Sequence, residues 1–255
     1  MKLTLIKGDC SKVLLNLPGN SIDLVVTSPP YNLGVDYGTF KDNLPWDKYY
    51  KWCEKWLKEL FRVLKKDGRL CLNHYFSLGT SKRRESPLMT LNEIAKNIGF
   101  KHHAVAFWID RTRIKYTAWG SWLSASAPYI NSPYEGVLIL YKEKWKKTSP
   151  GISTISEEDF KKGISGVWNF GPDSEKLTPS SFPIKLPKLC IELLSYKGDV
   201  VLDPFLGSGT TMKACLELGR SCIGIEINPK YIEIIKKRLN WGSTLGDVEF
   251  VYKEV

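Results

Sequence analysis

The sequence has few of the residues that build metal sites, and their spacing is wrong for the purpose. Among 255 residues there are only three histidines, two of them adjacent as His102 and His103, and the six cysteines form no C-x-x-C pair. Structural zinc sites typically use such closely spaced ligand pairs, so we expect no metal site. Cysteines without this spacing are more typical of buried thiols in a reducing compartment.

Long apolar runs are also missing. No stretch approaches the ~18 consecutive apolar residues that a membrane-spanning helix needs. At the amino terminus, Lys2, Lys7 and Asp9 interrupt the apolar residues too early for a secretory signal. We therefore expect a cytoplasmic protein without a membrane partner.

The composition is that of a globular chain with an excess of positive charge. Hydrophobic residues make up 43% and charged residues 25% of the sequence, and the length suits one large domain or a domain with an insertion. Lysine and arginine outnumber aspartate and glutamate by 37 to 27, a formal net charge of +10. This excess favours a polyanionic partner such as nucleic acid, although solvated lysine surfaces give the same balance.

Strand-like and helix-like segments alternate along most of the chain. The patterns predict strands at 3–6, 22–26, 69–75, 103–109, 136–141, 199–202 and 222–225. They predict helices at 11–17 with Ser11 as cap, at 46–66 with a stop at Asp67-Gly68, and at 89–98, 184–195, 212–218 and 229–239, followed by a short tail. This alternation indicates an α/β fold with a doubly wound, mostly parallel sheet.

The alternation breaks in two irregular segments, at about 110–132 and 142–176. The first interleaves basic and aromatic side chains, and the second carries several lysines. Such a pattern suits contacts with phosphates and bases, but an aromatic insertion that packs on its own core fits equally well. We expect both segments to form a small recognition lobe, and the DNA-binding candidates are Arg111, Arg113, Lys115, Tyr116, Trp119 and Trp122.

A rigid polar loop follows the β-branched run of residues 22–26. It reads Thr27-Ser28-Pro29-Pro30-Tyr31 and is called the proline loop below. Each proline fixes its own φ and restricts the residue before it. The loop offers a hydroxyl, carbonyls at residues that lack an N–H, and an aromatic ring, which together suit a planar base with an exocyclic amino group. An ordinary proline-rich turn is the alternative interpretation.

A second loop, Asp203-Pro204-Phe205-Leu206-Gly207-Ser208-Gly209-Thr210-Thr211, joins a strand to a helix and is called the glycine loop. It lacks the Gly-Lys-Ser/Thr ending of nucleoside triphosphate sites, and Met212 replaces the third glycine of a dinucleotide fingerprint. Glu226 ends the next strand, where a carboxylate can hold ribose hydroxyls, and Asp203 adds negative charge that would attract a cation. Ribose without phosphate, together with a cation, describes S-adenosylmethionine; a glycine turn that only closes the connection is the alternative.

Together the two loops resemble the motifs of a known family, the amino-group DNA methyltransferases. Ser28-Pro29-Pro30-Tyr31 resembles the catalytic motif of that family and the glycine loop resembles its cofactor motif, in the order of the circularly permuted beta group. Gly8-Asp9-Cys10 is similar to the segment near the cofactor adenine. Residues 178–183 are similar to the segment before the first cofactor helix, with Thr178 where the family usually has histidine.

The resemblance implies a Rossmann-like S-adenosylmethionine-dependent methyltransferase fold with one reversed strand, formed by residues 1–255 as a single catalytic domain. It implies methyl transfer to a base flipped out of double-stranded DNA, with Ser28 Oγ and the Pro29 carbonyl accepting hydrogen bonds from the amino group and Tyr31 stacking on the base. The catalytic residues it implies are Ser28, Pro29, Pro30 and Tyr31. The cofactor-binding residues it implies are Asp9, Cys10, Thr27, Phe182, Asp203, Phe205, Gly207, Ser208, Gly209, Thr210, Thr211 and Glu226.

The sequence also bears on which atom is methylated. Transfer to cytosine carbon 5 needs a thiolate that in its family follows a proline, and no cysteine here does. Serine at the first motif position favours cytosine N4 in this family, with adenine N6 as the alternative. A non-catalytic nucleic-acid-binding module with a vestigial cofactor pocket, and an RNA or protein methyltransferase, are further alternatives. A separate restriction endonuclease is a conceivable partner, and the oligomeric state is not encoded in any motif.

Overall fold

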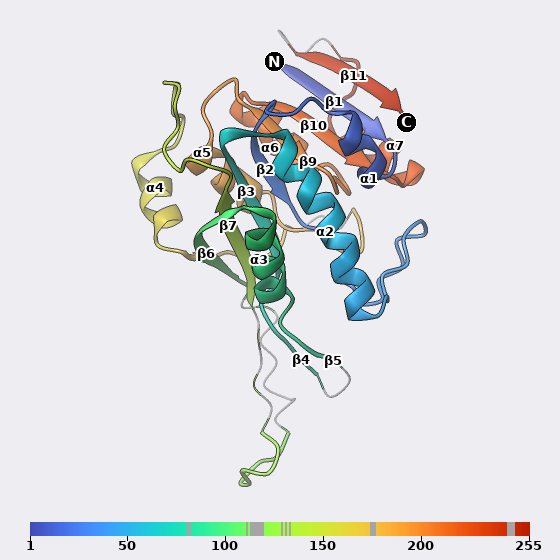
Figure 1. Cartoon of the computed structure of the whole chain (residues 1–255), viewed down its shortest axis with the longest axis vertical. Coiled ribbons are helices and arrows are strands. Elements are labelled where there is room, and N and C mark those ends of the chain that lie inside the picture. Colours follow the sequence, from blue (N-terminus) through green and yellow to red (C-terminus); the bar gives the residue numbers. More distant parts are fainter. Residues whose placement is uncertain are drawn as a thin grey trace.

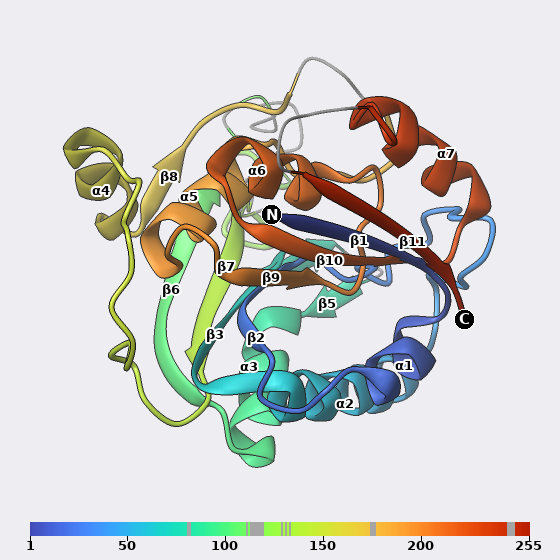
Figure 2. The same cartoon turned by 90° about the horizontal axis from the view of Figure 1, so that it is seen from above.

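A computed structural model describes residues 1–80, 83–110, 112, 120–128, 130, 132, 134–173, 177–243 and 248–255. Within these ranges, nine strands form one sheet in the order β11-β1-β10-β9-β2-β3-β7-β6-β8 (Figures 1 and 2). The strands are β1 (Lys2–Lys7), β2 (Ile22–Thr27), β3 (Leu64–Tyr75), β6 (Lys101–Ile109), β7 (Tyr134–Tyr141), β8 (Val167–Asn169), β9 (Val200–Asp203), β10 (Ser221–Glu226) and β11 (Glu249–Glu254).

Strand β7 is the only one of these nine strands that runs against its neighbours. It pairs antiparallel with β3 and with β6, whereas every other pair in the described sheet is parallel. The prediction of a mostly parallel sheet with one reversed strand is therefore confirmed. The central strands are apolar on both faces, and all six residues of β2 are buried, as expected for a parallel sheet covered on both sides.

Helices cover both faces of the sheet, which confirms the doubly wound arrangement. Figure 2 shows α1, α2 and α3 on one face and α5, α6 and α7 on the other. The two apolar cores, one under each layer, include all six cysteines, which are buried free thiols as predicted. The helices are α1 (Cys10–Val13) with a 3₁₀ turn at Leu14–Asn16, α2 (Trp46–Val63), α3 (Pro87–Ile98), α4 (Glu157–Ile164), α5 (Lys185–Leu194), α6 (Thr210–Leu218) and α7 (Pro229–Arg238).

The predicted boundaries of two helices are wrong. The cap of α1 is Asp9, whose Oδ1 accepts a hydrogen bond from the Ser11 N–H at 2.8 Å, so Ser11 lies inside the helix. Helix α2 ends at Val63, because Leu64 already pairs with Ile22 of β2. Asp67-Gly68 then forms an irregularity within β3, where the register against β2 shifts, and does not stop the helix.

Residues 142–176 are more regular than predicted. They contain α4 and β8, and the Cβ position of Gly163 in α4 lies against Leu193 of α5. Lys147 Nζ binds Asp23 Oδ1 at 3.1 Å and Asp199 Oδ2 at 3.0 Å, at the beginnings of β2 and β9. Lys147 therefore lies at the sheet edge opposite the proline loop. The prediction of an irregular segment is wrong for residues 157–164 and 167–169, which form α4 and β8.

Two further elements escaped the sequence patterns. The predicted short tail contains β11, which pairs in parallel with β1 at one edge of the sheet. Strands β4 (Leu78–Thr80) and β5 (Arg83–Glu85) form a hairpin outside the main sheet. Figure 1 shows this hairpin and the loop of residues 120–128 projecting from the same end of the molecule.

Candidate active site

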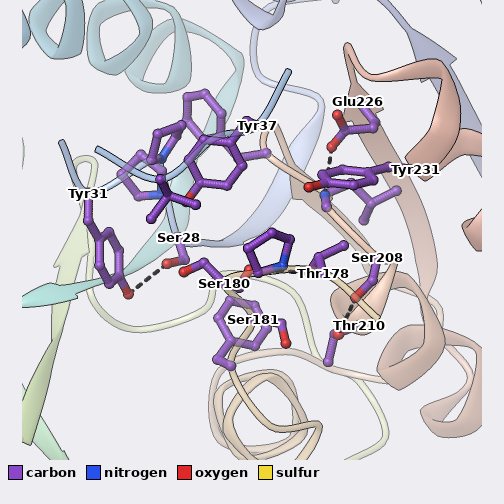
Figure 3. Close-up of a pocket in the computed structure, with 18 of the residues that line it drawn as sticks. Ser28, Tyr31, Tyr37, Thr178, Ser180, Ser181, Ser208, Thr210, Glu226 and Tyr231 are labelled. Carbon is purple, nitrogen blue, oxygen red and sulfur yellow. Dashed lines mark hydrogen bonds between the residues drawn. The ribbon is translucent and has the colours of Figure 1, made fainter. Parts of the chain in front are cut away.

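A cavity of about 630 Å³ lies at the carboxyl ends of β1, β2, β9 and β10. These strands are parallel, so the segments that follow them meet at one edge of the sheet. The cavity is lined by the proline loop from Ser28 to Tyr31, by the glycine loop from Pro204 to Ser208 with Thr210, and by Glu226 (Figure 3). The structure thus brings together the two loops that the sequence placed 176 residues apart, as counted from Thr27 to Asp203.

The cavity is acidic. Five carboxylic residues lie in its described lining, and no lysine, arginine or histidine accompanies them there. Such a lining repels phosphate groups and attracts a sulfonium or an ammonium. The charge of the site therefore fits S-adenosylmethionine better than a phosphorylated nucleotide. The five are Asp9, Asp110, Glu135, Asp173 and Glu226.

The glycine loop is shaped by its two glycines and anchored by Glu226. Gly207 and Gly209 have φ values of 57° and 84°, a region that other residues rarely adopt. The Gly207 N–H donates to Glu226 Oε2 and the Asn228 N–H to Glu226 Oε1, each at 2.8 Å. Burial raises the pKa of Glu226 to about 7, although these backbone hydrogen bonds oppose the rise. The fixed carboxylate keeps further lone pairs for ribose hydroxyls.

Asp203 does not line the cavity, although the sequence suggested that its charge would face the cofactor. Its carboxylate is 1% exposed and accepts hydrogen bonds from Thr27 Oγ1 at 2.7 Å, Thr211 Oγ1 at 2.6 Å and the Phe205 N–H at 3.0 Å. Burial raises the pKa of Asp203 to about 6. Thr27, Gly209 and Thr211 are also absent from the lining, so these four residues form the frame beneath the loop.

The remaining cofactor candidates line the cavity: Asp9, Cys10, Phe182, Phe205, Gly207, Ser208, Thr210 and Glu226. The Asp9 carboxylate caps α1, which fixes its orientation. Burial, followed by the charge of Asp9, raises the pKa of Cys10 to about 12, so its thiol stays neutral and is no nucleophile. Tyr37 and Tyr231 also line the cavity and were not found from the sequence, since they lie outside any motif.

The proline loop is held by a buried hydrogen-bond network. Ser28 Oγ donates to the Tyr31 hydroxyl at 2.8 Å, and that hydroxyl donates to Glu135 Oε2 at 2.7 Å. Asn73 Nδ2 donates to both the Tyr31 hydroxyl, at 2.6 Å, and Glu135 Oε2, at 2.7 Å. The Pro30 carbonyl accepts a hydrogen bond from Tyr49 at 2.7 Å, whereas none of the described residues donates to the Pro29 carbonyl.

Tyr31 is more enclosed than a simple stacking platform would be. Its side chain is 7% exposed, and its ring lies against His74 with centroids 4.3 Å apart and against the edge of Tyr75 at 5.2 Å. Stacking on a base would use only the part of the ring that still lines the cavity. Burial is the main reason that the pKa of Tyr31 lies well above its usual value, so the hydroxyl keeps its proton.

Glu135 and Asn73 were missed by the sequence analysis. The predicted strand began at Gly136, and nothing in the sequence marks β7 as the reversed strand. Because β7 is antiparallel to β3, its amino-terminal end lies at the same edge of the sheet as the carboxyl ends of the other strands. A single acidic residue in the apolar run Tyr134–Tyr141 is the signal that could have drawn attention to Glu135.

One of the six DNA-binding candidates lies within the described residues and five lie outside them. Arg111, Arg113, Lys115, Tyr116 and Trp119 lie outside the described residues. Trp122 is described: it is 72% exposed, in a loop closed by a bridge between Gly120 and Pro128. This loop leaves the body of the protein at the end that also carries the β4–β5 hairpin (Figure 1).

The described part of the chain also bears on metal sites and on membrane-spanning helices. There, no group of three or more histidine, cysteine, aspartate or glutamate side chains is arranged to hold a metal ion. The helices of the same ranges are all too short or too polar to cross a membrane.

The doubly wound sheet with one reversed strand and the acidic cavity at its carboxyl edge fit S-adenosylmethionine, which is the cofactor of the methyltransferase family that the chain matches. A family model described as DNA methylase matches residues 22–237, and the chain belongs to this family.

Two curated relatives extend the comparison. Type II methyltransferase M.MjaVI of Methanocaldococcus jannaschii is 45% identical over 175 residues, which cover 68% of this chain and 88% of the relative. DNA adenine methyltransferase YhdJ of Escherichia coli is 28% identical over 264 residues, which cover 94% of this chain and 83% of the relative.

Solved structures share the fold over almost the whole chain. TTHA0409 of Thermus thermophilus superposes with a TM-score of 0.79 at 25% identity, covering 99% of this chain and all of the other. That protein has also been solved in complex with S-adenosyl-L-methionine. The PvuII DNA methyltransferase, which is cytosine-N4-specific, superposes with a TM-score of 0.70 at 21% identity, covering 97% and 96% of the two chains.

Proposed function

We propose that the protein is a site-specific DNA methyltransferase of a type II restriction-modification system, which methylates the exocyclic N4 of a cytosine flipped out of double-stranded DNA. The observation that carries this proposal is the meeting of the proline loop and the glycine loop in one acidic cavity. In this order of loops the chain follows the circularly permuted beta group. A cognate restriction endonuclease, acting as a separate protein, belongs to the proposal.

The cavity would hold the cofactor through residues of both halves of the chain. The Glu226 carboxylate accepts hydrogen bonds from the ribose hydroxyls, and Asp9, Cys10 and Phe182 lie along the same lining for the rest of the nucleoside. S-adenosylmethionine supplies an electrophilic methyl group on a sulfonium. The acidic lining attracts that positive charge and holds it near Ser28.

The proline loop would act on the target nitrogen. An exocyclic amino nitrogen shares its lone pair with the ring and is a poor nucleophile. Ser28 Oγ and the Pro29 carbonyl accept hydrogen bonds from the two hydrogens of the amino group and favour a tetrahedral nitrogen, which frees the lone pair to bond to the methyl carbon. The carbon–sulfur bond would break with its electron pair returning to sulfur, and the methylated nitrogen would then release one proton to solvent water. Most of the rate enhancement comes from orientation.

The choice of cytosine N4 rests on Ser28 at the first position of the motif. The fold shared with the cytosine-N4-specific PvuII enzyme is in keeping with it. Methylation of adenine N6 is the second candidate, because the relative YhdJ is a DNA adenine methyltransferase. Both bases present the same kind of amino group, so the geometry around Ser28 serves either.

One experiment separates these candidates. Mixed-sequence double-stranded DNA is methylated with labelled cofactor, digested to nucleosides, and the labelled nucleoside is identified; its position is then mapped by sequencing. N4-methylcytosine supports the proposal, and N6-methyladenine replaces it by the second candidate. The absence of label from the DNA would refute DNA methylation altogether.

A further inference from the structure

The hydrogen-bond network behind Ser28 has a direction. A carboxylate can only accept hydrogen bonds, so the Tyr31 hydroxyl must direct its hydrogen to Glu135 Oε2, 2.7 Å away. The Tyr31 oxygen then accepts from Ser28 Oγ at 2.8 Å, as Figure 3 shows. It also accepts from Asn73 Nδ2 at 2.6 Å. With its hydrogen turned toward Tyr31, Ser28 can present only lone pairs to a ligand in the cavity.

Glu135 is placed to keep this direction fixed. It is 4% exposed and comes from β7, an element outside the proline loop. Asn73 Nδ2 also donates to Glu135 Oε2, at 2.7 Å, so two donors converge on one carboxylate oxygen. With two donors directed at it, this oxygen acts as an acceptor and keeps the Tyr31 hydrogen turned away from Ser28.

We propose that Glu135 is a positioning residue that fixes the direction of the Ser28 hydroxyl and thereby makes the site select a base with an amino group over its oxo counterpart. An amino group offers hydrogens to the Ser28 lone pairs, whereas a carbonyl oxygen brings lone pairs against them. Sites built to accept a substrate hydrogen reject analogues that lack it. The inference rests on the proposed function and names the group selected at that site.

Replacing the carboxylate by an apolar side chain of similar length removes the acceptor. In Glu135→Met, the Asn73 donor still occupies the Tyr31 oxygen, so the Tyr31 hydrogen turns to Ser28 Oγ. The Ser28 hydrogen is then directed into the cavity, toward the amino group. Glu135→Gln retains an amide oxygen that can accept from Tyr31, so it should preserve more of the activity.

The first test is a double-mutant cycle on methyl transfer. We expect Glu135→Met to lower kcat by about 10- to 100-fold with unchanged cofactor affinity by calorimetry, and Glu135→Gln to lower it less. In a Tyr31→Phe background, Glu135→Met should cause no additional loss, because its effect passes through the Tyr31 hydroxyl. Glu249→Gln, an exposed change on β11, serves as control.

The second test uses the target base itself. Once the site is mapped, duplexes carry either the target base or its oxo counterpart, which is uracil for cytosine and hypoxanthine for adenine. Wild-type protein should bind the amino duplex more tightly, and Glu135→Met should narrow this ratio by about fivefold, the value of one neutral hydrogen bond. This measurement needs no turnover.

The inference is overturned if Glu135→Met keeps the wild-type kcat, or if its cofactor affinity falls as much as its kcat. It is also overturned if the losses of Glu135→Met and Tyr31→Phe add in the double mutant, or if Glu135→Met leaves the binding ratio of amino and oxo duplexes unchanged. Failure of the proposed function gives a different result, since the wild-type protein itself would then methylate no DNA or would methylate adenine instead of cytosine.

Discussion

The Thr27 hydroxyl donates a 2.7 Å hydrogen bond to Asp203 Oδ1, which joins the end of β2 to the end of β9. The same carboxylate accepts from Thr211 at the start of α6. One buried side chain therefore holds the proline loop and the glycine loop in fixed relative positions. If the proposed function holds, this junction sets the distance between a bound methyl donor and Ser28.

Weakening this junction should cost stability. Thr211→Val keeps the shape of the side chain but removes one of three donors to a buried carboxylate, and we expect a loss of about 1–3 kcal/mol in the free energy of unfolding. In the wild type, the hydrogen bond from Thr211 lowers the pKa of Asp203. Without this bond, the pKa of Asp203 is higher in the variant than in the wild type. The loss should therefore be full well above pH 6, where Asp203 is charged, and shrink below it.

Urea denaturation at several pH values measures this effect. Ser153→Ala, which removes a hydroxyl from an exposed residue in a loop, is the control. An equal loss at pH 5 and pH 8 would show that the Asp203 charge is not involved.

Ser28→Ala should separate catalysis from cofactor binding. Ser28 donates to Tyr31 and lines the cavity on the side of the proline loop, while Glu226 belongs to the other side. We expect methyl transfer to fall about 100-fold or more, with the cofactor dissociation constant unchanged. Single-turnover kinetics and calorimetry check the two quantities; equal losses in both would contradict the assigned role.

Glu226→Gln should weaken cofactor binding by about 10- to 100-fold, because a charge-assisted hydrogen bond to ribose is lost. The pKa of Glu226 is raised to about 7, and the cationic cofactor favours the charged carboxylate. Wild-type affinity should therefore fall as the pH drops below about 7, by up to tenfold per pH unit.

Calorimetric titrations between pH 5.5 and pH 8.5, a range of about three units around that pKa, test both statements. The affinity of Glu226→Gln should depend less on pH than that of the wild type. Parallel pH profiles would assign the dependence to another group, and the other carboxylic residues in the described lining, Asp9, Asp110, Glu135 and Asp173, would then be tested.

Neutralising Arg111, Arg113 and Lys115 should flatten the salt dependence of DNA binding. Each phosphate contact contributes about 0.9 to the slope of log K against log salt, so three contacts would lower it by up to about 2.7. Fluorescence anisotropy at a series of salt concentrations gives the slope. Neutralising Lys2, Lys161 and Lys253, three basic residues on other elements, should leave it nearly unchanged.

Lys147 should matter for stability rather than for DNA. It bridges Asp23 and Asp199 with a side chain that is 9% exposed, so Lys147→Ala leaves two nearby carboxylates without this cation. We expect a loss of about 1–3 kcal/mol in unfolding free energy, because Lys65 still pairs with Asp23, and an unchanged DNA affinity. The neighbouring, exposed Lys146→Ala is the control. Weaker DNA binding without a loss of stability would instead support recognition by this segment.

Much of the site could be predicted because its parts are local. A β-branched strand that ends in two prolines, and a glycine turn followed by a strand that ends in Glu226, are patterns of neighbouring residues whose backbone consequences are short-range. The parallel order of the strands then requires both loops to meet at one edge. The cavity at that edge, lined by Ser28 and Gly207, agrees with this argument.

The roles of individual side chains at the junction could not be predicted from the local sequence, because they depend on contacts between distant segments. Asp203 was expected to face a ligand, but three donors around its carboxylate place it in the frame below the cavity. Its position in the motif did not show where Thr27 and Thr211 would direct their hydroxyls. The carboxylates that do line the cavity include Asp110 and Glu135, which no local pattern had marked.

The sequence by itself therefore determined the α/β alternation, the rigid proline loop, and a glycine loop suited to a ligand without phosphate. These features depend on backbone preferences and on the spacing of apolar residues, which act over a few positions. Tertiary structure alone decided which side chains complete the site. Reversal of β7 brings Glu135 to Tyr31, and contacts of this kind between distant segments depend on strand direction, which the residues of β7 do not encode locally.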